Sequence, residues 1–380
     1  MARFSKRKLL KWHSWSALIC VIPLLVICLT GAILVFKHEI DWLFIGEQVR
    51  VDESRDHLSE RLPYDQLLTS LQEKVKDHEV VGWVVFLEPN RADQVYVMEK
   101  GTNAWSYLFI DQYTGNPLSE PRLHDHWFTD WLLELHFNLL LEDVGLIASA
   151  IFGLALFFLG ISGFILYRQF WKTLFLLRWN ARLVTYFSDL HKTVGIICSP
   201  VLLVLSFTGV WWNIAGYLHE LEEHSDGHEH PLVQERLYND EISIDSLVAA
   251  AQAQVSGFKP TYFSFPYEPN LPITIFGDVP TKNVLTSQYS STASFDAETG
   301  EDLGTYDIRQ ATVGAKIIDS YRRLHFGDFA GLWSRILWAV AGASPALLSV
   351  TGIYVWFKRR RKKRKTAIQR YGIAGDSQTA

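Results

Sequence analysis

The stretch LHKTVGIICSPVLLVLSFTG, residues 190–209, decides the fold, because His191 stands at the head of an apolar run that ends on Thr208-Gly209. An earlier stretch, residues 12–31, repeats this arrangement, with His13 at the head of a run that ends on Thr30-Gly31. Both landmarks recur at the same offset, 191 − 13 = 178 and 209 − 31 = 178. Ionisable side chains are costly at membrane depth and usually have a function there. The chain therefore has the pattern of an internal duplication that carries histidines at the ends of membrane helices.

A second pair of histidines supports this interpretation. Leu135-His136-Phe137 precedes an apolar run that ends on Ser162-Gly163, and Leu324-His325-Phe326 precedes one that ends on Thr351-Gly352. The two histidines are 325 − 136 = 189 residues apart, and so are the two glycines. Four histidines in two repeats predict two matched pairs of metal ligands.

Four uncharged stretches predict an α-helical membrane protein with four transmembrane helices in two internal repeats. They are residues 14–36, 144–167, 193–217 and 336–357, and each has at least the roughly 20 residues that cross about 30 Å of hydrocarbon. The first is interpreted as a retained helix, because its apolar core is longer than the ~7–15 residues of a signal peptide. Pro23 and Pro200 lie near the same depth, and we expect them to bend their spans.

The charges predict the orientation. Basic residues gather before the first span, between the second and third, and in the tail after the fourth, as cytoplasmic segments do. The two long loops are acidic, with 21 Asp/Glu against 9 Lys/Arg over residues 37–143 and 18 against 8 over residues 218–335. We therefore expect a protein of the bacterial inner membrane with both termini in the cytoplasm. Anionic lipid accounts for the basic tail, so nucleic acid is not an expected partner.

Each long loop is expected to form a small α+β module on the periplasmic side. The first has a helical pattern at 63–75 and strand patterns at 80–87, 94–99 and 105–111, and the second has them at 244–255, 262–266, 272–277 and 287–296. Both modules end on the same turn signal, Asp111-x-x-Thr114-Gly115 and Asp296-x-x-Thr299-Gly300.

These patterns divide the chain into eight parts. The expected boundaries are the N-terminus and first span at 1–36, the first module at 37–142, the second span at 143–167, a cytoplasmic link at 168–188, the third span at 189–217, the second module at 218–330, the fourth span at 331–357 and the basic tail at 358–380.

Over residues 8–360 the chain resembles the PepSY-associated transmembrane family. The motifs that carry the resemblance are Trp12-His13 with Thr30-Gly31, Leu135-His136-Phe137, Leu190-His191-Lys192 with Thr208-Gly209, Leu324-His325-Phe326, and the Asp-x-x-Thr-Gly ends of the two modules. Within the family, the resemblance is closest to inner-membrane ferric-siderophore reductases. It implies haem b with bis-histidine ligation and electron delivery to iron chelates in the periplasm. No Cys-x-x-Cys-His occurs in the chain, which excludes covalent attachment of a c-type haem and leaves two b-type haems as the expected cofactors.

Repeat symmetry predicts which histidines meet. His13 and His191 each start an outward-going span, whereas His136 and His325 each precede an inward-going one, so we expect the pairs His13–His191 and His136–His325. Two imidazole ligands fill both axial positions of a haem iron, which then transfers electrons. Histidines that only lie at the lipid interface are the alternative. The glycines that end the four runs allow close approach of either a porphyrin or another helix.

Other histidines are weaker candidates. His38 and His219 follow outward-going spans, and they could be interfacial groups or additional ligands. The run that contains His224, His228 and His230 is rich in metal-ligand residue types, but it is also typical of a solvated loop.

Two classes of function follow. In the first, the chain is an oxidoreductase that reduces a ferric siderophore, or another periplasmic acceptor, and the acidic loops would favour a cationic chelate. No Gly-x-Gly-x-x-Gly follows a strand, so electrons would come from a quinol or from a cytoplasmic flavin or NAD(P)H reductase. In the second, the chain is a non-enzymatic sensor or binding protein whose modules recognise a peptide or ligand.

Overall fold

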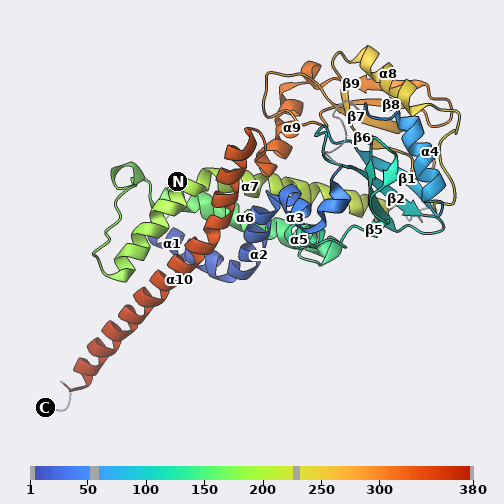
Figure 1. The fold of residues 1–380 in the computed structure, drawn as a ribbon. Helices are drawn as coiled ribbons and strands as arrows, with labels where there is room; N and C mark the ends of the chain where they lie inside the picture. Colours follow the sequence, from blue (N-terminus) through green and yellow to red (C-terminus); the bar gives the residue numbers. More distant parts are fainter. Residues whose placement is uncertain (1–4, 52–59, 226–231, 377–380) are drawn as a thin grey trace.

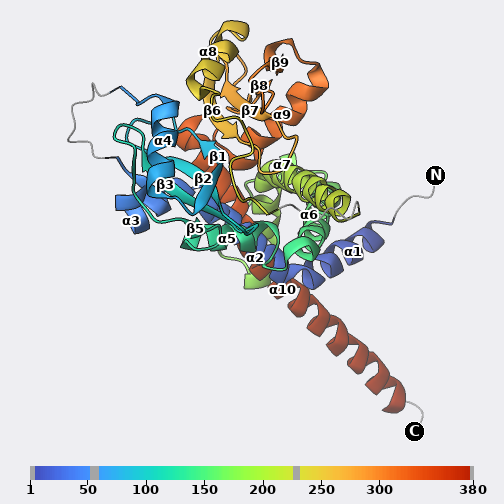
Figure 2. The same ribbon diagram turned by 90° about the vertical axis from the view of Figure 1, so that its right-hand side faces the viewer.

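The computed structural model describes residues 5–51, 60–225 and 232–376 of the chain. A bundle of apolar helices forms one part of the molecule, and a β-sheet with two helices on it lies beyond one end of the bundle (Figures 1 and 2). The C-terminal helix, drawn in red, extends from the bundle in the direction away from the sheet.

Three helices are long and apolar enough to cross a membrane. They are α6 (Glu142–Leu166), α7 (Leu183–Ser225) and α10 (Gly331–Asp376), the last two over Leu183–Glu222 and Gly331–Lys362. The first expected span is not one continuous helix. It consists of α1 (Lys6–Ile19) and α2 (Val21–Leu34), which meet at an angle of 69° and together pass the same test.

Proline explains the break between α1 and α2. Pro23 has no N–H to donate to the carbonyl of Ile19, and its ring clashes with that carbonyl. Helix α1 accordingly ends at Ile19, and Cys20 leaves the helical region at φ −92° and ψ 3°. The expected bend is thus confirmed at Pro23, whereas α7 continues as a helix through Pro200.

The helices differ in length from the expected spans. Helix α7 begins at Leu183, inside the expected link, and continues to Ser225, and α10 includes much of the basic tail. The link between α6 and α7 contains a short 3₁₀ turn, η1 (Phe170–Lys172), and lies at the end of the bundle far from the sheet (Figure 1). The basic link and the basic tail therefore leave the bundle away from the sheet.

The strands of both long loops form one sheet. The first loop supplies β1 (His78–Val84), β2 (Asp93–Glu99), β3 (Trp105–Asp111), β4 (Asn116–Pro117) and β5 (Arg122–Leu123), and the second supplies β6 (Lys259–Ser264), β7 (Ile273–Asp278), β8 (Ser291–Phe295) and β9 (Asp302–Tyr306). The order is β4-β3-β2-β1-β6-β7-β8-β9, with β5 paired to β3. Strands β1 and β6 join the two halves in antiparallel register, with Trp83 opposite Phe263.

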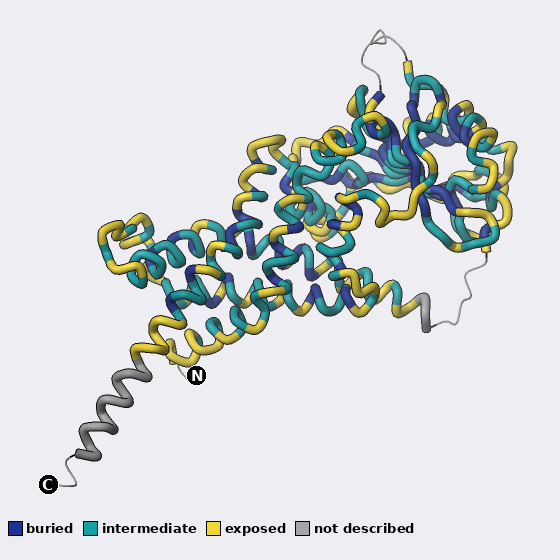
Figure 3. The backbone as a smooth tube through the Cα atoms, turned by 60° about the horizontal axis from the view of Figure 1, so that its bottom comes forward, coloured by how far each residue is buried: buried dark blue, intermediate teal, exposed yellow. Residues whose placement is uncertain are grey.

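The main core lies between this sheet and two helices, α4 (Tyr64–Lys74) and α8 (Ile244–Gln254). Alternate strand residues such as Trp83, Leu108 and Phe263 are fully buried there, as the two-residue period of a strand requires. Figure 3 shows this core as the largest buried region of the chain. The expected helix and three strands of each half are thus confirmed, within a single sheet.

The two halves also hold each other's helix N-termini. The Asp245 carboxylate accepts hydrogen bonds from the backbone N–H groups of Tyr64 and Asp65, both at 3.0 Å. The Asp65 carboxylate in turn accepts from the N–H of Ile244 at 2.7 Å and from the Ser243 hydroxyl at 2.5 Å. A carboxylate at a helix N-terminus satisfies N–H groups that lack an intrahelical partner, so this exchange fixes α4 beside α8.

The expected turns after Asp111 and Asp296 are present. The Asp111 carboxylate accepts from the N–H of Tyr113 at 2.9 Å, and that of Asp296 accepts from the N–H of Thr299 at 2.8 Å. Gly115 and Gly300 have φ of +67° and +72°, a conformation that glycine adopts without steric cost.

Short helices precede the last helix of each repeat. Helix α5 (Phe128–Phe137) precedes α6, and α9 (Val313–Phe326) precedes α10. The α5–α6 turn holds Leu139, Leu140 and Glu142 at positive φ. The equivalent of Glu142 in the α9–α10 turn is Gly331, since 331 − 142 = 189, and it also has positive φ. These turns let α5 and α9 reach the bundle at its sheet end.

Candidate functional site

The four motif histidines form two groups. His136 on α5 and His325 on α9, here called the sheet-side pair, have ring centroids 6.2 Å apart at an interplanar angle of 50°. His13 on α1 and His191 on α7, here called the tail-side pair, also lie near each other. The structure therefore brings together the same partners that repeat symmetry predicts.

One ring nitrogen of His136 forms hydrogen bonds to helix α2. The Nδ1 atom of His136 lies 2.9 Å from the carbonyl of Ile27 and 3.2 Å from the hydroxyl of Thr30, both on α2. The Thr30 hydroxyl donates its own proton to the carbonyl of Val26, at 2.7 Å. A hydroxyl has one proton, so towards the histidine it acts as an acceptor. Nδ1 therefore carries the ring proton, and the lone pair is on Nε2.

His325 on α9 forms the equivalent hydrogen bond to α7. Its Nδ1 lies 2.8 Å from the Thr208 hydroxyl, which donates to the carbonyl of Val204 at 2.8 Å. The ring proton is again on Nδ1, and the basic Nε2 is the atom that can ligate a metal. Among the described residues, neither Nε2 of the sheet-side pair forms a hydrogen bond.

The tail-side pair follows the same pattern at the other level of the bundle. Nδ1 of His191 lies 3.0 Å from the carbonyl of Leu348 and 3.1 Å from the Thr351 hydroxyl, both on α10. Nδ1 of His13 lies 2.7 Å from the Ser162 hydroxyl on α6.

The two levels are well separated. His191 and Thr208, which bonds the sheet-side His325, are 208 − 191 = 17 residues apart on α7, or about 26 Å at the rise of an α-helix.

The glycine after each hydroxyl lies against the same histidine at three of the four positions. A Cβ atom on Gly31 would come within 2.6 Å of His136 Cε1, one on Gly209 within 3.2 Å of His325 Cε1, and one on Gly352 within 3.1 Å of His191 Cε1. At Gly163 a Cβ would meet nothing within 4 Å. Three of the terminal glycines thus make room for an imidazole ring of a neighbouring helix, which agrees with the expected close approach of another helix.

Aromatic and basic side chains connect the sheet-side pair to the sheet. Trp212 lies 5.3 Å from the His325 ring and 5.9 Å from that of Phe326. The Arg322 guanidinium lies 4.6 Å from the Phe326 ring centroid and 4.7 Å from that of Tyr289, in the loop before β8. A line of ring–ring and cation–π contacts therefore runs from His325 towards the second half of the sheet.

The weaker histidine candidates lie elsewhere. His38 stacks on Trp42 along α3 (Lys37–Val49), with ring centroids 5.5 Å apart, and burial lowers its pKa. His219 is exposed on α7. Of the run with three histidines, His228 and His230 lie outside the described residues, as does the side chain of His224. In the described part of the chain, no three His, Cys, Asp or Glu side chains gather as a metal site.

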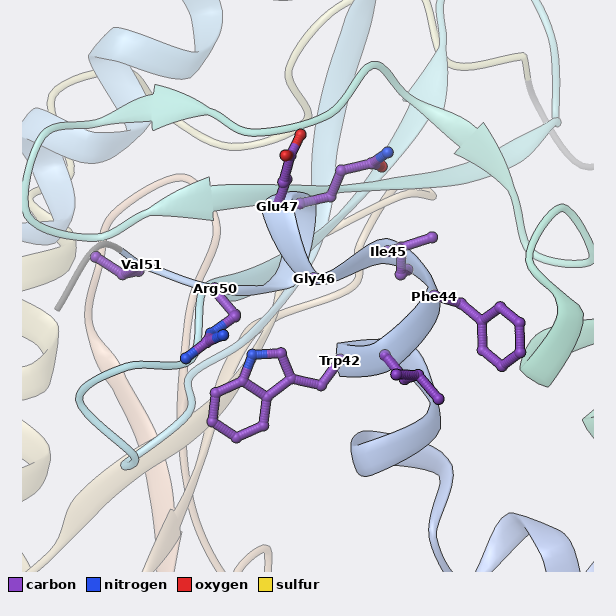
Figure 4. Close-up of a pocket in the computed structure, with 9 residues that line it drawn as sticks. Trp42, Phe44, Ile45, Gly46, Glu47, Arg50 and Val51 are labelled. Carbon is purple, nitrogen blue, oxygen red and sulfur yellow. The ribbon is translucent and has the colours of Figure 1, made fainter.

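A hollow of about 840 Å³ lies at the kink in α3, where Ile45 leaves the helical region. Residues 42–48, 50 and 51 line it, and the Arg50 guanidinium lies 4.3 Å from the Trp42 ring centroid (Figure 4). None of these residues is a metal-ligand histidine or cysteine, so we do not place the functional site there.

The hydroxyl groups that bond the histidines were not predicted from the sequence. Thr30, Ser162, Thr208 and Thr351 each stand directly before a terminal glycine, so the signal was present as a recurring Thr-Gly or Ser-Gly dipeptide. The sequence does not show which histidine each dipeptide meets.

Comparison with known proteins agrees with this architecture. An uncharacterized protein of Pseudomonas aeruginosa is 26% identical to the chain over 255 residues, which cover 61% of this chain and 64% of the relative, slightly less than two thirds of its length. The model of the PepSY-associated TM region matches residues 10–359, which include all four paired histidines and both halves of the sheet. The chain belongs to the PepSY-associated transmembrane family.

Proposed function

We propose that this protein crosses the bacterial inner membrane four times, with the α1–α2 pair as the first span, and holds two b-type haems. His136 and His325 would ligate one haem, and His13 and His191 the other. The separation of the sheet-side rings carries this proposal. If each Nε2 lies about 2 Å from a metal, as histidine nitrogen does, the ring centroids on opposite sides of it lie about 6 Å apart, close to the 6.2 Å of this pair.

The tautomer of the rings supports the same assignment. A histidine binds a metal through a neutral imidazole nitrogen, and a hydrogen bond at the other nitrogen sets which one is available. At all four histidines a hydroxyl accepts the bond from Nδ1, which leaves Nε2 as the ligand atom. Iron with two imidazole ligands is six-coordinate, and the chemistry that it supplies is electron transfer.

The orientation of the chain gives this chemistry a direction. The basic link and tail leave the bundle away from the sheet, and basic segments are retained in the cytoplasm. We therefore propose that the sheet is periplasmic, with the PepSY-like modules as its two halves, and that the tail-side pair is cytoplasmic. Electrons from a quinol or a cytoplasmic reductase would enter at the tail side and leave at the sheet side.

The proposed acceptor is a ferric siderophore. The sequence resembles the ferric-siderophore reductase FoxB, and Fe(II) binds hard oxygen chelators far more weakly than Fe(III). One electron delivered to the bound Fe(III) would therefore release the iron as Fe(II).

The absorbance of the purified full-length protein tests the cofactor. We expect a b-type spectrum that shifts on addition of dithionite, and two haems per chain in a pyridine haemochromogen assay. A colourless protein with intact secondary structure would refute the assignment and favour a non-enzymatic sensor or binding protein.

Rapid mixing of the reduced protein with a panel of ferric chelates tests the acceptor. Oxidation by ferric siderophores in the time of mixing is the expected result. A haem-loaded protein that reduces none of them would point to another periplasmic acceptor.

A further inference from the structure

The four hydroxyl–glycine dipeptides form a single recurring device. Each hydroxyl accepts a hydrogen bond from Nδ1 of a histidine on another helix. Each hydroxyl and its histidine belong to the same repeat. In the first repeat α2 bonds His136 and α6 bonds His13, and in the second α7 bonds His325 and α10 bonds His191.

A second bond extends each contact into a chain. The hydroxyls of Thr30, Thr208 and Thr351 donate to the carbonyl four residues earlier, at 2.7 to 2.8 Å, and Ser162 donates to Leu159 at 3.2 Å. Consecutive hydrogen bonds polarise one another. In each series of two hydrogen bonds, the ring Nδ1–H donates to the hydroxyl, and the hydroxyl donates to a carbonyl of its own helix.

We propose that these hydroxyls are positioning residues that set the tautomer and the donor strength of the haem ligands. This inference rests on the proposed haem function. A bond accepted from Nδ1–H raises the basicity of the opposite nitrogen, so each hydroxyl strengthens the Nε2 ligand and favours ferric over ferrous iron.

The four histidines differ in how many hydrogen-bond acceptors their Nδ1 atoms have. His136 and His191 each have a backbone carbonyl at 2.9 to 3.0 Å as a second acceptor, and His325 has a backbone interaction with Leu205. For His13, the Ser162 hydroxyl is the one Nδ1 partner in the described structure. The glycine beside Ser162 is also the one that leaves open space, so His13 depends on its hydroxyl more than the other three.

Removal of single hydroxyls from the full-length haem-loaded protein tests this ranking. Ser162→Ala should weaken haem retention at the tail-side pair by about 10- to 100-fold, the usual effect of losing an outer partner of a metal ligand. Thr351→Val at the same pair should have a smaller effect, because the carbonyl of Leu348 remains. Haem transfer to an excess of a haem scavenger protein measures retention.

A redox titration separates positioning from packing. Ser162→Ala should raise the reduction potential of the tail-side haem, and Ser162→Thr, which keeps a hydroxyl, should restore it. Ser199→Ala is the matched control, since the Ser199 hydroxyl is buried on α7 and bonds the carbonyl of Gly195 rather than a histidine. Equal potentials and retention in Ser162→Ala and the control would overturn the inference.

Nitrogen-15 NMR of the histidine rings keeps the test independent of haem binding. In the haem-free full-length protein we expect the Nδ1–H tautomer at all four histidines, and its loss at His13 in Ser162→Ala. Nε2–H rings in a protein that binds two haems would refute the role of the hydroxyls alone. A wild-type protein that takes up no haem but shows Nδ1–H rings would refute the proposed function and leave the tautomer assignment standing.

Discussion

Gly31→Ala is the substitution whose effect the structure defines most sharply. The new Cβ would lie 2.6 Å from His136 Cε1, whereas ordinary van der Waals contact begins at 3.4 Å. The ring would have to move by at least 3.4 − 2.6 = 0.8 Å, or α2 would have to move away from α5. Metal–ligand distances tolerate changes of only about 0.2 Å, so the sheet-side haem should lose His136 as a ligand.

The energetic cost can be bounded independently. Inserting a methyl group into a packed interior costs about 1–3 kcal/mol, and where haem binding requires the wild-type position of the ring, this cost lowers haem affinity by up to roughly 150-fold. We expect Gly31→Ala to retain the tail-side haem and to hold the sheet-side haem weakly or with one axial histidine. Haem content per chain and the low-spin ferric EPR signal measure both outcomes.

Gly163→Ala is the matched control for this substitution. Both glycines lie inside apolar helices and follow a hydroxyl residue, so the gain in helix propensity is similar in the two variants. At Gly163 the added Cβ meets nothing within 4 Å, and both haems should remain. Two bis-histidine haems in Gly31→Ala, with the spectrum of the wild type, would refute the claim that the glycine makes room for the ligand ring.

Three further outcomes follow from other parts of the structure. His136→Ala should abolish the sheet-side haem and spare the tail-side haem, while His38→Ala should keep both, as counted by the haemochromogen assay; loss of both haems in a folded His136→Ala protein would contradict the pairing. Glu142→Gly should stabilise the protein by about 1 kcal/mol, because Glu142 has φ of +51° and a side chain disfavours that region by about this amount; a melting temperature in detergent no higher than that of the wild type would contradict this. Hydrogen bonding to Arg335 lowers the pKa of Glu39 below its ordinary value of 4.5. The pair therefore stabilises the protein above pH 4.5, and this contribution is lost as the pH falls through the lowered pKa. The melting temperatures of the wild type and Glu39→Gln should converge in acid.

Local pattern predicted the elements of the sheet well. Helical spacing at 63–75 and 244–255 and strand patterns in both loops correspond to α4, α8 and the longer strands, because each has its own apolar face to bury. The joining of both halves through β1 and β6 was not predicted. That pairing connects residues about 180 positions apart, such as Trp83 and Phe263, and nothing in either strand alone specifies its neighbour.

For the apolar helices, too, some features were predicted from the sequence and others were not. Uncharged length located the three helices that are long and apolar enough to cross a membrane and the bent α1–α2 pair, and Pro23 marked the break between α1 and α2. The N-terminal extension of α7 to Leu183 was missed, because its first turns are amphipathic and partly polar rather than apolar. Apolar length identifies the part of a helix that lipid would surround, and it does not report where the hydrogen-bonded helix ends.

The candidate site required both the repeat offsets of the sequence and the helix packing of the structure. Repeat offsets sufficed to pair His136 with His325 and His13 with His191, because equivalent positions of a duplicated unit lie at equivalent depths. The partners of Nδ1 could not be predicted, because they depend on how neighbouring helices rotate. His136 reaches Thr30 only because the α5–α6 turn places α5 against α2.

The duplication itself is what completes each site. One repeat supplies a single histidine at each level, His13 and His136 in the first and His191 and His325 in the second. A single repeat could therefore hold a six-coordinate iron only by pairing with a second copy in a two-fold arrangement, in which equivalent surfaces meet. The β1–β6 junction and the exchange of N-terminal caps between α4 and α8 have that same reciprocal form. Joining both copies in one chain makes the pairing intramolecular, so both ligands of each proposed haem are present at any protein concentration.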